Sequence, residues 1–272
     1  MVGKAPAQRF TVYADVLIPR SSFFKAARKP EWTDATKATC LEDEEPTVFT
    51  RYLNCVYFGV QTLNLDGDAP EDDREPHSPE EDLQPRPDAF DRAEEKHTAG
   101  SKIAEEYGNY HVYVQQCFIA LAEVYFLADR LQDLETANLI IDQIIRFAAS
   151  RRVLPWVQVA NLVYESTVHG NPLRKLLRDY CVYETHGSGY MEMYYSGWPS
   201  ELTRDVTAEF LRIMDCSKEK SVITIQRNVG TMEKCRYHQH GKDHPRCLTK
   251  TKKPRHDLRP AEKSATEGSV EA

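Results

Sequence analysis

The sequence has little that would direct the chain out of the cell or into a membrane. Residues 1–6 contain no apolar stretch like the core of a secretory signal, and no later run reads as a membrane span. The 7 cysteines are an odd number, and Cys55, Cys117 and Cys181 fall in predicted helices, which favours reduced, buried thiols over a disulfide framework. We therefore expect an intracellular protein, in the nucleus or the cytoplasm, with no membrane partner.

Recognised catalytic motifs are also missing. The sequence has no glycine-rich phosphate loop, no Gly-x-Ser-x-Gly turn and no His-Glu-x-x-His pair of zinc ligands. Gly187 and Gly189 indicate only a turn. We expect a protein that is not an enzyme.

Charge is distributed unevenly along the chain, although the net charge is only −7. Acidic residues crowd residues 66–95, whereas lysine and arginine dominate residues 218–259. Residues 64–106 have few apolar side chains, so we expect a disordered acidic insertion; a docking segment or phosphorylation at Ser78 is the alternative. Because closure entropy grows only logarithmically with loop length, two halves of one domain can flank such an insertion. The acidic run makes nucleic acid an unlikely partner for the folded part.

The first sixty residues predict alternating strands and helices. Residues 10–14 are β-branched and aromatic and suit a strand, with Asp15 as the N-cap of a following helix. Residues 21–27 predict a second helix, and residues 36–41 predict a second strand. A third helix is expected from Pro46, with one apolar face made of Phe49, Tyr52, Leu53, Val56 and Tyr57.

Helical periodicity returns near residue 110. The first apolar stripe consists of Val114, Phe118, Leu121, Ala122, Tyr125 and Ala128. Asp133 is then a predicted N-cap for a partner helix whose apolar side chains are Ala137, Ile140, Ile141, Ile144 and Ala148. We expect these two helices to form an antiparallel hairpin, followed by helices within residues 155–170, 172–183 and 199–214.

Short blocks of sequence occur here in a characteristic order. They are FTVYADVL from Phe10, SFF from Ser22, WTD from Trp32, LEDEEPTVF from Leu41, YLNCVYFG from Tyr52, YFLADRLQDL from Tyr125 and ANLIID from Ala137. Together they resemble a BTB/POZ domain of the kind abundant in filamentous fungi. Such a domain normally opens with a strand that here only residues 1–3 could represent, which implies a shortened sheet or a lost beginning of the chain.

The resemblance implies an α+β fold, in which a small sheet is capped by helical hairpins. This BTB/POZ domain would occupy residues 1–150, interrupted by the acidic insertion. Residues 151–215 would form a helical extension, and residues 216–272 a mostly disordered basic tail. The implied function is association with protein partners, including a second copy to form a homodimer.

A candidate partner-binding motif lies at Trp32-Thr33-Asp34. It resembles the hydrophobic-x-glutamate motif of BTB proteins that recruit a cullin-3 ubiquitin ligase, with aspartate in place of glutamate. The other reading is that Trp32 fills the edge of the core and Asp34 caps a turn. The helix from Pro46 would add four side chains to the same binding face, namely Thr47, Thr50, Arg51 and Asn54.

The tail contains a metal-like pattern. Cys235, His238, His240 and Cys247 supply the four nitrogen and sulfur donors that a structural zinc ion requires. The same pattern resembles Cys/His endings of the fungal BTB group. The alternative is a disordered tail with incidental cysteines and no cofactor.

Residues 250–255 look like a short basic nuclear-import signal. The alternative is a solvated tail, since short basic runs are also common in such tails. The main hypothesis is therefore a protein-interaction module, with a cullin-3 adaptor as its named form. The second hypothesis is a nuclear regulatory factor whose basic tail contacts nucleic acid.

Overall fold

The computed structural model describes residues 1–29, 38–63, 99–151, 153–155, 157–184, 197–217, 229, 234–241 and 247, with the backbone alone at 99–109 and 216–217. Within these ranges the regular structure is helical. The α-helices are α1 (Ala14–Arg20), α2 (Ser22–Ala27), α3 (Pro46–Phe58), α4 (Ala99–Arg130), α5 (Leu134–Arg151), α6 (Val157–Ser166), α7 (Pro172–Tyr183) and α9 (Ser200–Ser217). Short 3-10 turns occur at η1 (Val60–Leu63) and η4 (Lys234–Arg236).

The α+β prediction with a small sheet is wrong for the described residues. The extended pairing there consists of isolated bridges that join Val2 to Gln8 and to Leu41. Residues 10–13 form no strand, and α1 begins at Ala14 with Tyr13 as its N-cap. The predicted strand at 36–41 has one bridged residue, Leu41, within its described part.

The physical reason is that the half-buried side chains of Phe10 and Val12 pack against the helical core without a strand partner. The Phe10 ring packs edge-on against Phe49 on α3, with ring centroids 5.0 Å apart. The Tyr13 N–H donates to the Tyr57 hydroxyl at 3.0 Å instead of to a neighbouring strand. The aromatic and β-branched side chains therefore belong to an extended segment that packs on helices, and not to a strand.

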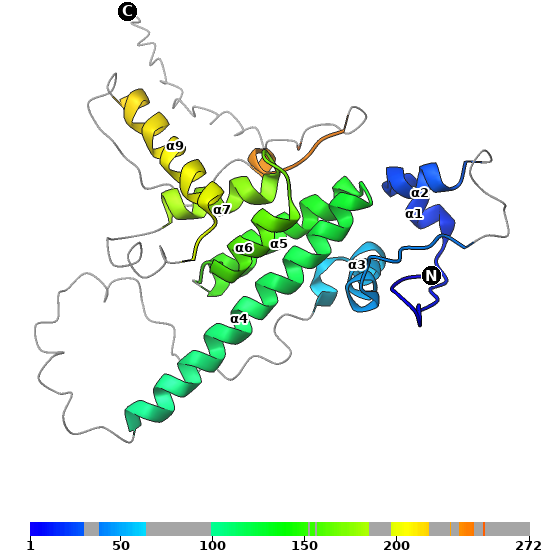
Figure 1. The fold of residues 1–272 in the computed structure, drawn as a ribbon, viewed down its shortest axis with the longest axis horizontal. Helices are drawn as coiled ribbons and strands as arrows, with labels where there is room; N and C mark the ends of the chain where they lie inside the picture. Colours follow the sequence, from blue (N-terminus) through cyan, green and yellow to red (C-terminus); the bar gives the residue numbers. More distant parts are fainter. Residues whose placement is uncertain are drawn as a thin grey trace, which may run out of the picture.

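The centre of the molecule is the antiparallel hairpin of α4 and α5, as predicted. α3 packs against both helices of the hairpin, α6 packs against α4 and α7, and α9 packs against α7 and α6. Figure 1 shows α1, α2 and α3 at one end of this array and α9 at the other. The two stretches of chain on either side of residues 64–98 thus share one interior.

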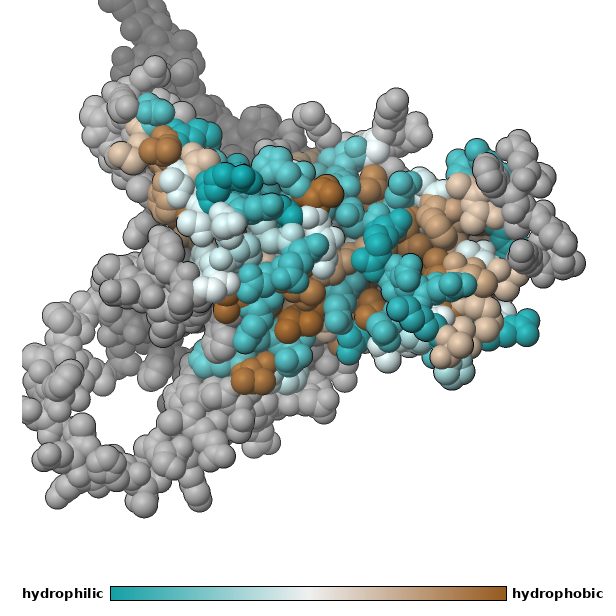
Figure 2. Space-filling view, viewed as in Figure 1, coloured by the Kyte–Doolittle hydropathy of each residue, from teal (hydrophilic) through white to brown (hydrophobic). Residues whose placement is uncertain are grey.

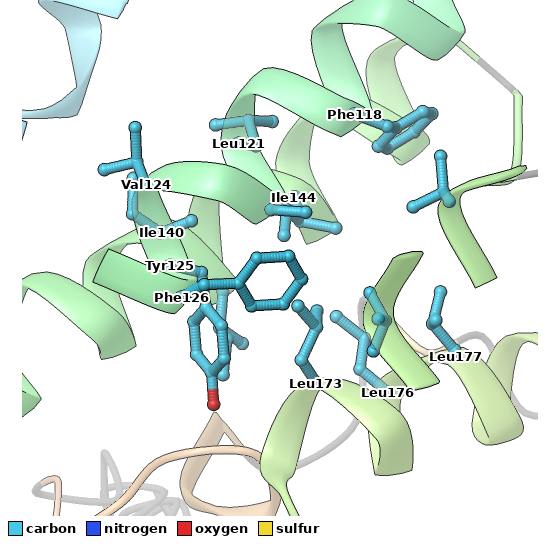
Figure 3. Close-up of a cluster of buried hydrophobic side chains, with 14 of the residues drawn as sticks. Phe118, Leu121, Val124, Tyr125, Phe126, Ile140, Ile144, Leu173, Leu176 and Leu177 are labelled. Carbon is cyan, nitrogen blue, oxygen red and sulfur yellow. The ribbon is translucent and has the colours of Figure 1, made fainter. Parts of the chain in front are cut away.

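The predicted apolar stripes form the core. On α4 the side chains of the stripe are at most 1% exposed, and the five predicted on α5 are at most 3% exposed. Figure 3 shows how Phe118, Leu121 and Tyr125 of α4 lie beside Ile140 and Ile144 of α5, with α7 closing the cluster through Leu173, Leu176 and Leu177. Burial of each such side chain stabilises the fold by about 1.5–3 kcal/mol before the entropy cost.

One segment of α4, Tyr110–Arg130, is long and apolar enough to cross a membrane by length and composition alone. In the structure 61% of its apolar window is buried. That is the behaviour of a central core helix, although the sequence analysis had expected no run of this length.

A buried polar cluster connects the N-terminal helices to the hairpin. Asp133 is fully buried and caps α5, since its Oδ1 accepts from the Thr136 N–H at 3.0 Å, as predicted. Its Oδ2 accepts from the Tyr52 hydroxyl of α3 at 3.0 Å and lies 3.5 Å from the Arg20 Nε of α1. Burial raises the pKa of Tyr52, and the neighbouring Asp133 charge raises it further, so the phenol stays a donor.

A second polar centre joins the three later helices. Arg174 on α7 is only 6% exposed, and its guanidinium donates to the Thr167 hydroxyl at 2.9 Å and to the Tyr164 carbonyl at 2.5 Å. It also pairs with Glu201 on α9 and lies over the Tyr164 ring, 4.4 Å from the centroid. α6, α7 and α9 were predicted as helices: α7 has the predicted bounds, α6 is shorter at both ends, and α9 continues to Ser217.

Candidate metal centre and candidate partner surface

The C-terminal segment of residues 234–241 lies against α5 and α7, where Figure 1 shows it in orange. Its anchor is Tyr237, which is 1% exposed and donates its hydroxyl to Asp179 Oδ2 of α7 at 2.8 Å. Arg236 Nε donates to the same oxygen at 2.6 Å. Asp179 is fully buried, so these charge-assisted hydrogen bonds hold the segment at a point that water does not reach.

Main-chain contacts position the middle of the segment. The Asn138 side chain of α5 accepts from the Gln239 N–H and donates to the Gln239 carbonyl, both at 2.8 Å. Lys175 Nζ of α7 donates to the Arg236 carbonyl at 2.8 Å. The Gln239 side-chain amide donates to Asp129 Oδ1 at 3.2 Å and reaches the Tyr125 hydroxyl at 3.4 Å, the polar tip of a ring that belongs to the core in Figure 3. The segment is therefore fixed to three helices.

This docking brings together the predicted metal ligands. One ligand atom each from Cys235, His240 and Cys247 lies within 4.8 Å of the other two, and all three residues are partly buried. The Cys247 Sγ is 4.0 Å from His240 Nε2. The predicted convergence of Cys235, His240 and Cys247 is thus present in the structure.

His238, the fourth predicted ligand, faces the same group. Its Nδ1 is 3.0 Å from Cys247 Sγ, and its side chain is 6% exposed. The other ring nitrogen, Nε2, lies 3.1 Å from Asp142 Oδ1 of α5. His238 therefore contacts the group with one nitrogen and the helical core with the other.

The distances within the group can be compared with those of a tetrahedral zinc site. With Zn–S bonds of about 2.3 Å and Zn–N bonds of about 2.0–2.1 Å, a sulfur and a nitrogen ligand lie about 3.6 Å apart. Relative to that value, the distance from Cys247 Sγ to His238 Nδ1 is short and that to His240 Nε2 is long, each by about 0.5 Å. His238 is not among the three residues whose ligand atoms all lie within 4.8 Å of one another.

The surroundings of Cys247 favour its neutral thiol over its thiolate. Burial raises the pKa of the Cys247 thiol, and its hydrogen bond with Cys235 and the nearby negative groups raise it further. A divalent cation reverses these effects, because it binds the thiolate and releases the proton.

The candidate partner surface is the outer face of α3. Of these predicted residues, Thr47, Thr50 and Arg51 are exposed and Asn54 is half-buried. Thr50 donates its hydroxyl to the Pro46 carbonyl at 2.9 Å, and Arg51 Nη1 pairs with Glu123 Oε2 of α4 at 3.4 Å. Phe58, which the sequence analysis did not select, is 66% exposed at the end of the same helix.

An apolar cleft of about 260 Å³ lies between the N-terminal segment, α1, α2 and the buried face of α3, and the outer-face residues of α3 do not line it. It is lined among others by Val2, Phe10, Leu17, Leu41 and Phe49. Figure 2 shows hydrophobic residues gathered over this end of the molecule, where α1 and α2 lie, whereas the surface of the later helices is mostly hydrophilic.

Several predictions fall outside the described residues. They are the Trp32 and Asp34 motif, most of the acidic insertion with Ser78, the turn at Gly187 and Gly189, and the basic run at 250–255. The structure adds functional residues that the sequence analysis missed: Asn138, Asp142 and Asp179. No local pattern marks them, since their contacts with the segment of residues 234–241 span 57 to 101 positions of the chain.

Comparisons of the chain with models of protein families, with curated proteins and with solved structures find no match.

Proposed function

We propose that the protein is a non-enzymatic protein-interaction module that binds a protein partner through the outer face of α3. The observation that carries this proposal is the division of α3 into two faces. Phe49, Tyr52 and Val56 are buried against the hairpin, whereas Phe58 is exposed beside a row of polar side chains. Burial of such an aromatic side chain by a partner would add apolar contact area to a polar surface.

The candidate partner is the cullin-3 scaffold. It is inferred from the resemblance of residues 10–59 and 125–142 to BTB/POZ proteins, some of which recruit a cullin-3 ligase. Arg51 and Asn54 would supply hydrogen bonds at the rim of the contact, and Phe58 would supply apolar area at its edge. The pair of Arg51 and Glu123 is exposed on both sides, so breaking it on binding costs little.

The test is direct binding of purified cullin-3 to the full-length chain, measured by surface plasmon resonance. We expect Phe58→Asp to weaken binding at least about tenfold, because it removes buried aromatic area and adds a charge. Val168→Asp is the matched control, since Val168 is 76% exposed at the turn before α7. Failure of the unmodified chain to bind cullin-3 would remove this partner. Sedimentation as a dimer that Phe58→Asp dissociates would assign the face to a second copy instead.

We also propose that the Cys/His group binds one structural zinc ion through Cys235, His238, His240 and Cys247. The convergence of three donor atoms and the position of His238 support this proposal. Elemental analysis of reduced, purified protein should give one zinc per chain, and the double variant Cys235→Ser, Cys247→Ser should give none. Equal zinc content in the two proteins would reject the site.

A further inference from the structure

His238 is placed between the Cys/His group and helix α5. Its Nε2 is 3.1 Å from Asp142 Oδ1, and its Nδ1 is 3.0 Å from Cys247 Sγ. A neutral imidazole that donates its Nε2–H to the carboxylate turns the Nδ1 lone pair toward the cysteine. Histidine ligands of zinc have this arrangement, in which a carboxylate holds the ring nitrogen that the metal does not use.

Asp142 belongs to a pair of anchors on one face of α5. Asn138 and Asp142 are four residues apart, so they lie one helical turn from each other. Asn138 binds the Gln239 main chain, whereas Asp142 binds the His238 side chain. Both are partly buried beside the apolar stripe of α5 and are not part of it.

We infer that Asp142 is a positioning residue of the metal centre, and that a bound ion stabilises the docking of residues 234–241 on α5. The inference rests on the proposed zinc site and goes beyond it. A zinc ion held only by the four tail residues would close a loop within the tail. Through Asp142, binding of the ion and docking of the segment on α5 become one coupled equilibrium.

The coupling has a defined direction. A docked segment presents His238 in the correct tautomer, so zinc binds more tightly than it would to the free segment. By reciprocity, bound zinc strengthens docking by the same factor. Loss of the Asp142 carboxylate therefore weakens zinc binding although the four ligands remain.

The experiment measures the zinc affinity of the reduced full-length chain by competition with a chromophoric chelator. We expect Asp142→Asn to weaken zinc binding by about 10–100-fold, the effect typical of losing such a carboxylate. Glu135→Gln is the matched control, because it makes the same charge change on α5 at a side chain that is 57% exposed and pairs with Arg20. Glu135→Gln should bind zinc like the unmodified chain.

Hydrogen exchange supplies a second readout. Zinc should increase protection of residues 234–241 in the unmodified chain and much less in Asp142→Asn, while α4 and α5 stay equally protected in both. Equal zinc affinities for Asp142→Asn and the unmodified chain would overturn the role of Asp142 and leave the zinc site intact. Full zinc binding by the Cys235→Ser, Cys247→Ser variant would overturn the site itself, and with it the coupling of zinc binding to docking on α5.

Discussion

Two regions of the molecule, one apolar and one polar, are held by different forces. Where α3 meets the α4–α5 hairpin, the contact is mainly apolar, with one buried polar cluster at Asp133. Where the segment of residues 234–241 meets α5 and α7, Tyr237 is the main buried side chain and the other contacts are hydrogen bonds and ion pairs. Apolar burial is insensitive to pH and to metals, whereas the polar contacts depend on protonation state and on any bound cation.

The largest effect should come from the apolar interior of the α4–α5 hairpin, on which the apolar region is built. Ile140 is fully buried between α5 and α4, so Ile140→Ala should lower the free energy of unfolding by about 2–5 kcal/mol through lost burial and a cavity. Urea unfolding followed by circular dichroism measures this loss. The exposed change Val168→Ala should stay within about 0.5 kcal/mol. A loss for Ile140→Ala that small would show that the hairpin is not the stabilising core.

A smaller and more local effect is expected at Asp179. Asp179→Asn removes the charge that binds Arg236 and Tyr237, at a cost of about 1.5–3 kcal/mol for hydrogen bonds to a charged group. Hydrogen exchange should show faster exchange at residues 234–241, with little change in α4. Asp205→Asn is the control, since it removes a similar carboxylate that binds Tyr164 away from the segment. Equal exchange in both variants would contradict the anchoring role of Asp179.

The pH dependence of the free energy of unfolding should reflect Glu209, a buried carboxylate of the polar region. Hydrogen bonds from the Arg212 guanidinium hold the pKa of the Glu209 carboxyl at about 2, although burial opposes this shift. A folded-state pKa below the unfolded value stabilises the fold at pH above about 4.5, and this contribution is lost as the pH falls toward 2. Glu209→Gln should therefore show a flatter decline in stability between about pH 4.5 and 2. An unchanged slope would mean that Glu209 is not held in this way.

The smallest effects concern thiol reactivity. Burial raises the pKa of the Cys55 and Cys181 thiols to about 12, so both should resist iodoacetamide at pH 8, whereas the exposed Cys40 should react. Mass spectrometry of the alkylated chain assigns each site. Zinc should slow the alkylation of Cys235 and Cys247 without changing that of Cys40. Equal labelling of these two cysteines with and without zinc would oppose the metal site.

The helices of this chain are easier to predict from its sequence than the segments that pack around them. Apolar residues at helical spacing, such as Val114, Phe118 and Leu121, located the core because one stripe can be buried in only one way. Asp133 was predicted as a cap from local chemistry, and its side chain accepts the expected main-chain hydrogen bond. The strand at residues 10–14 was wrong, since β-branched and aromatic residues suit an extended segment on helices as well as a strand in a sheet.

The metal centre could be predicted only in part for a similar reason. Cysteine and histidine spacing identifies ligands that lie close together in the chain. Asp142, in contrast, is 96 residues from His238, and only the packing of the tail on α5 brings them together. Long-range partners of this kind leave no local signal in a single sequence.

Asn138 recognises the peptide backbone of Gln239, as a neighbouring β-strand would, although a helix presents it. These main-chain hydrogen bonds do not depend on which side chain residue 239 carries. The two hydrogen bonds of the Gln239 side chain are longer than the two main-chain bonds. Among related chains, position 239 should therefore vary more freely than position 138. A library randomised at both positions and sorted for stable folding should retain asparagine at 138 and many residue types at 239.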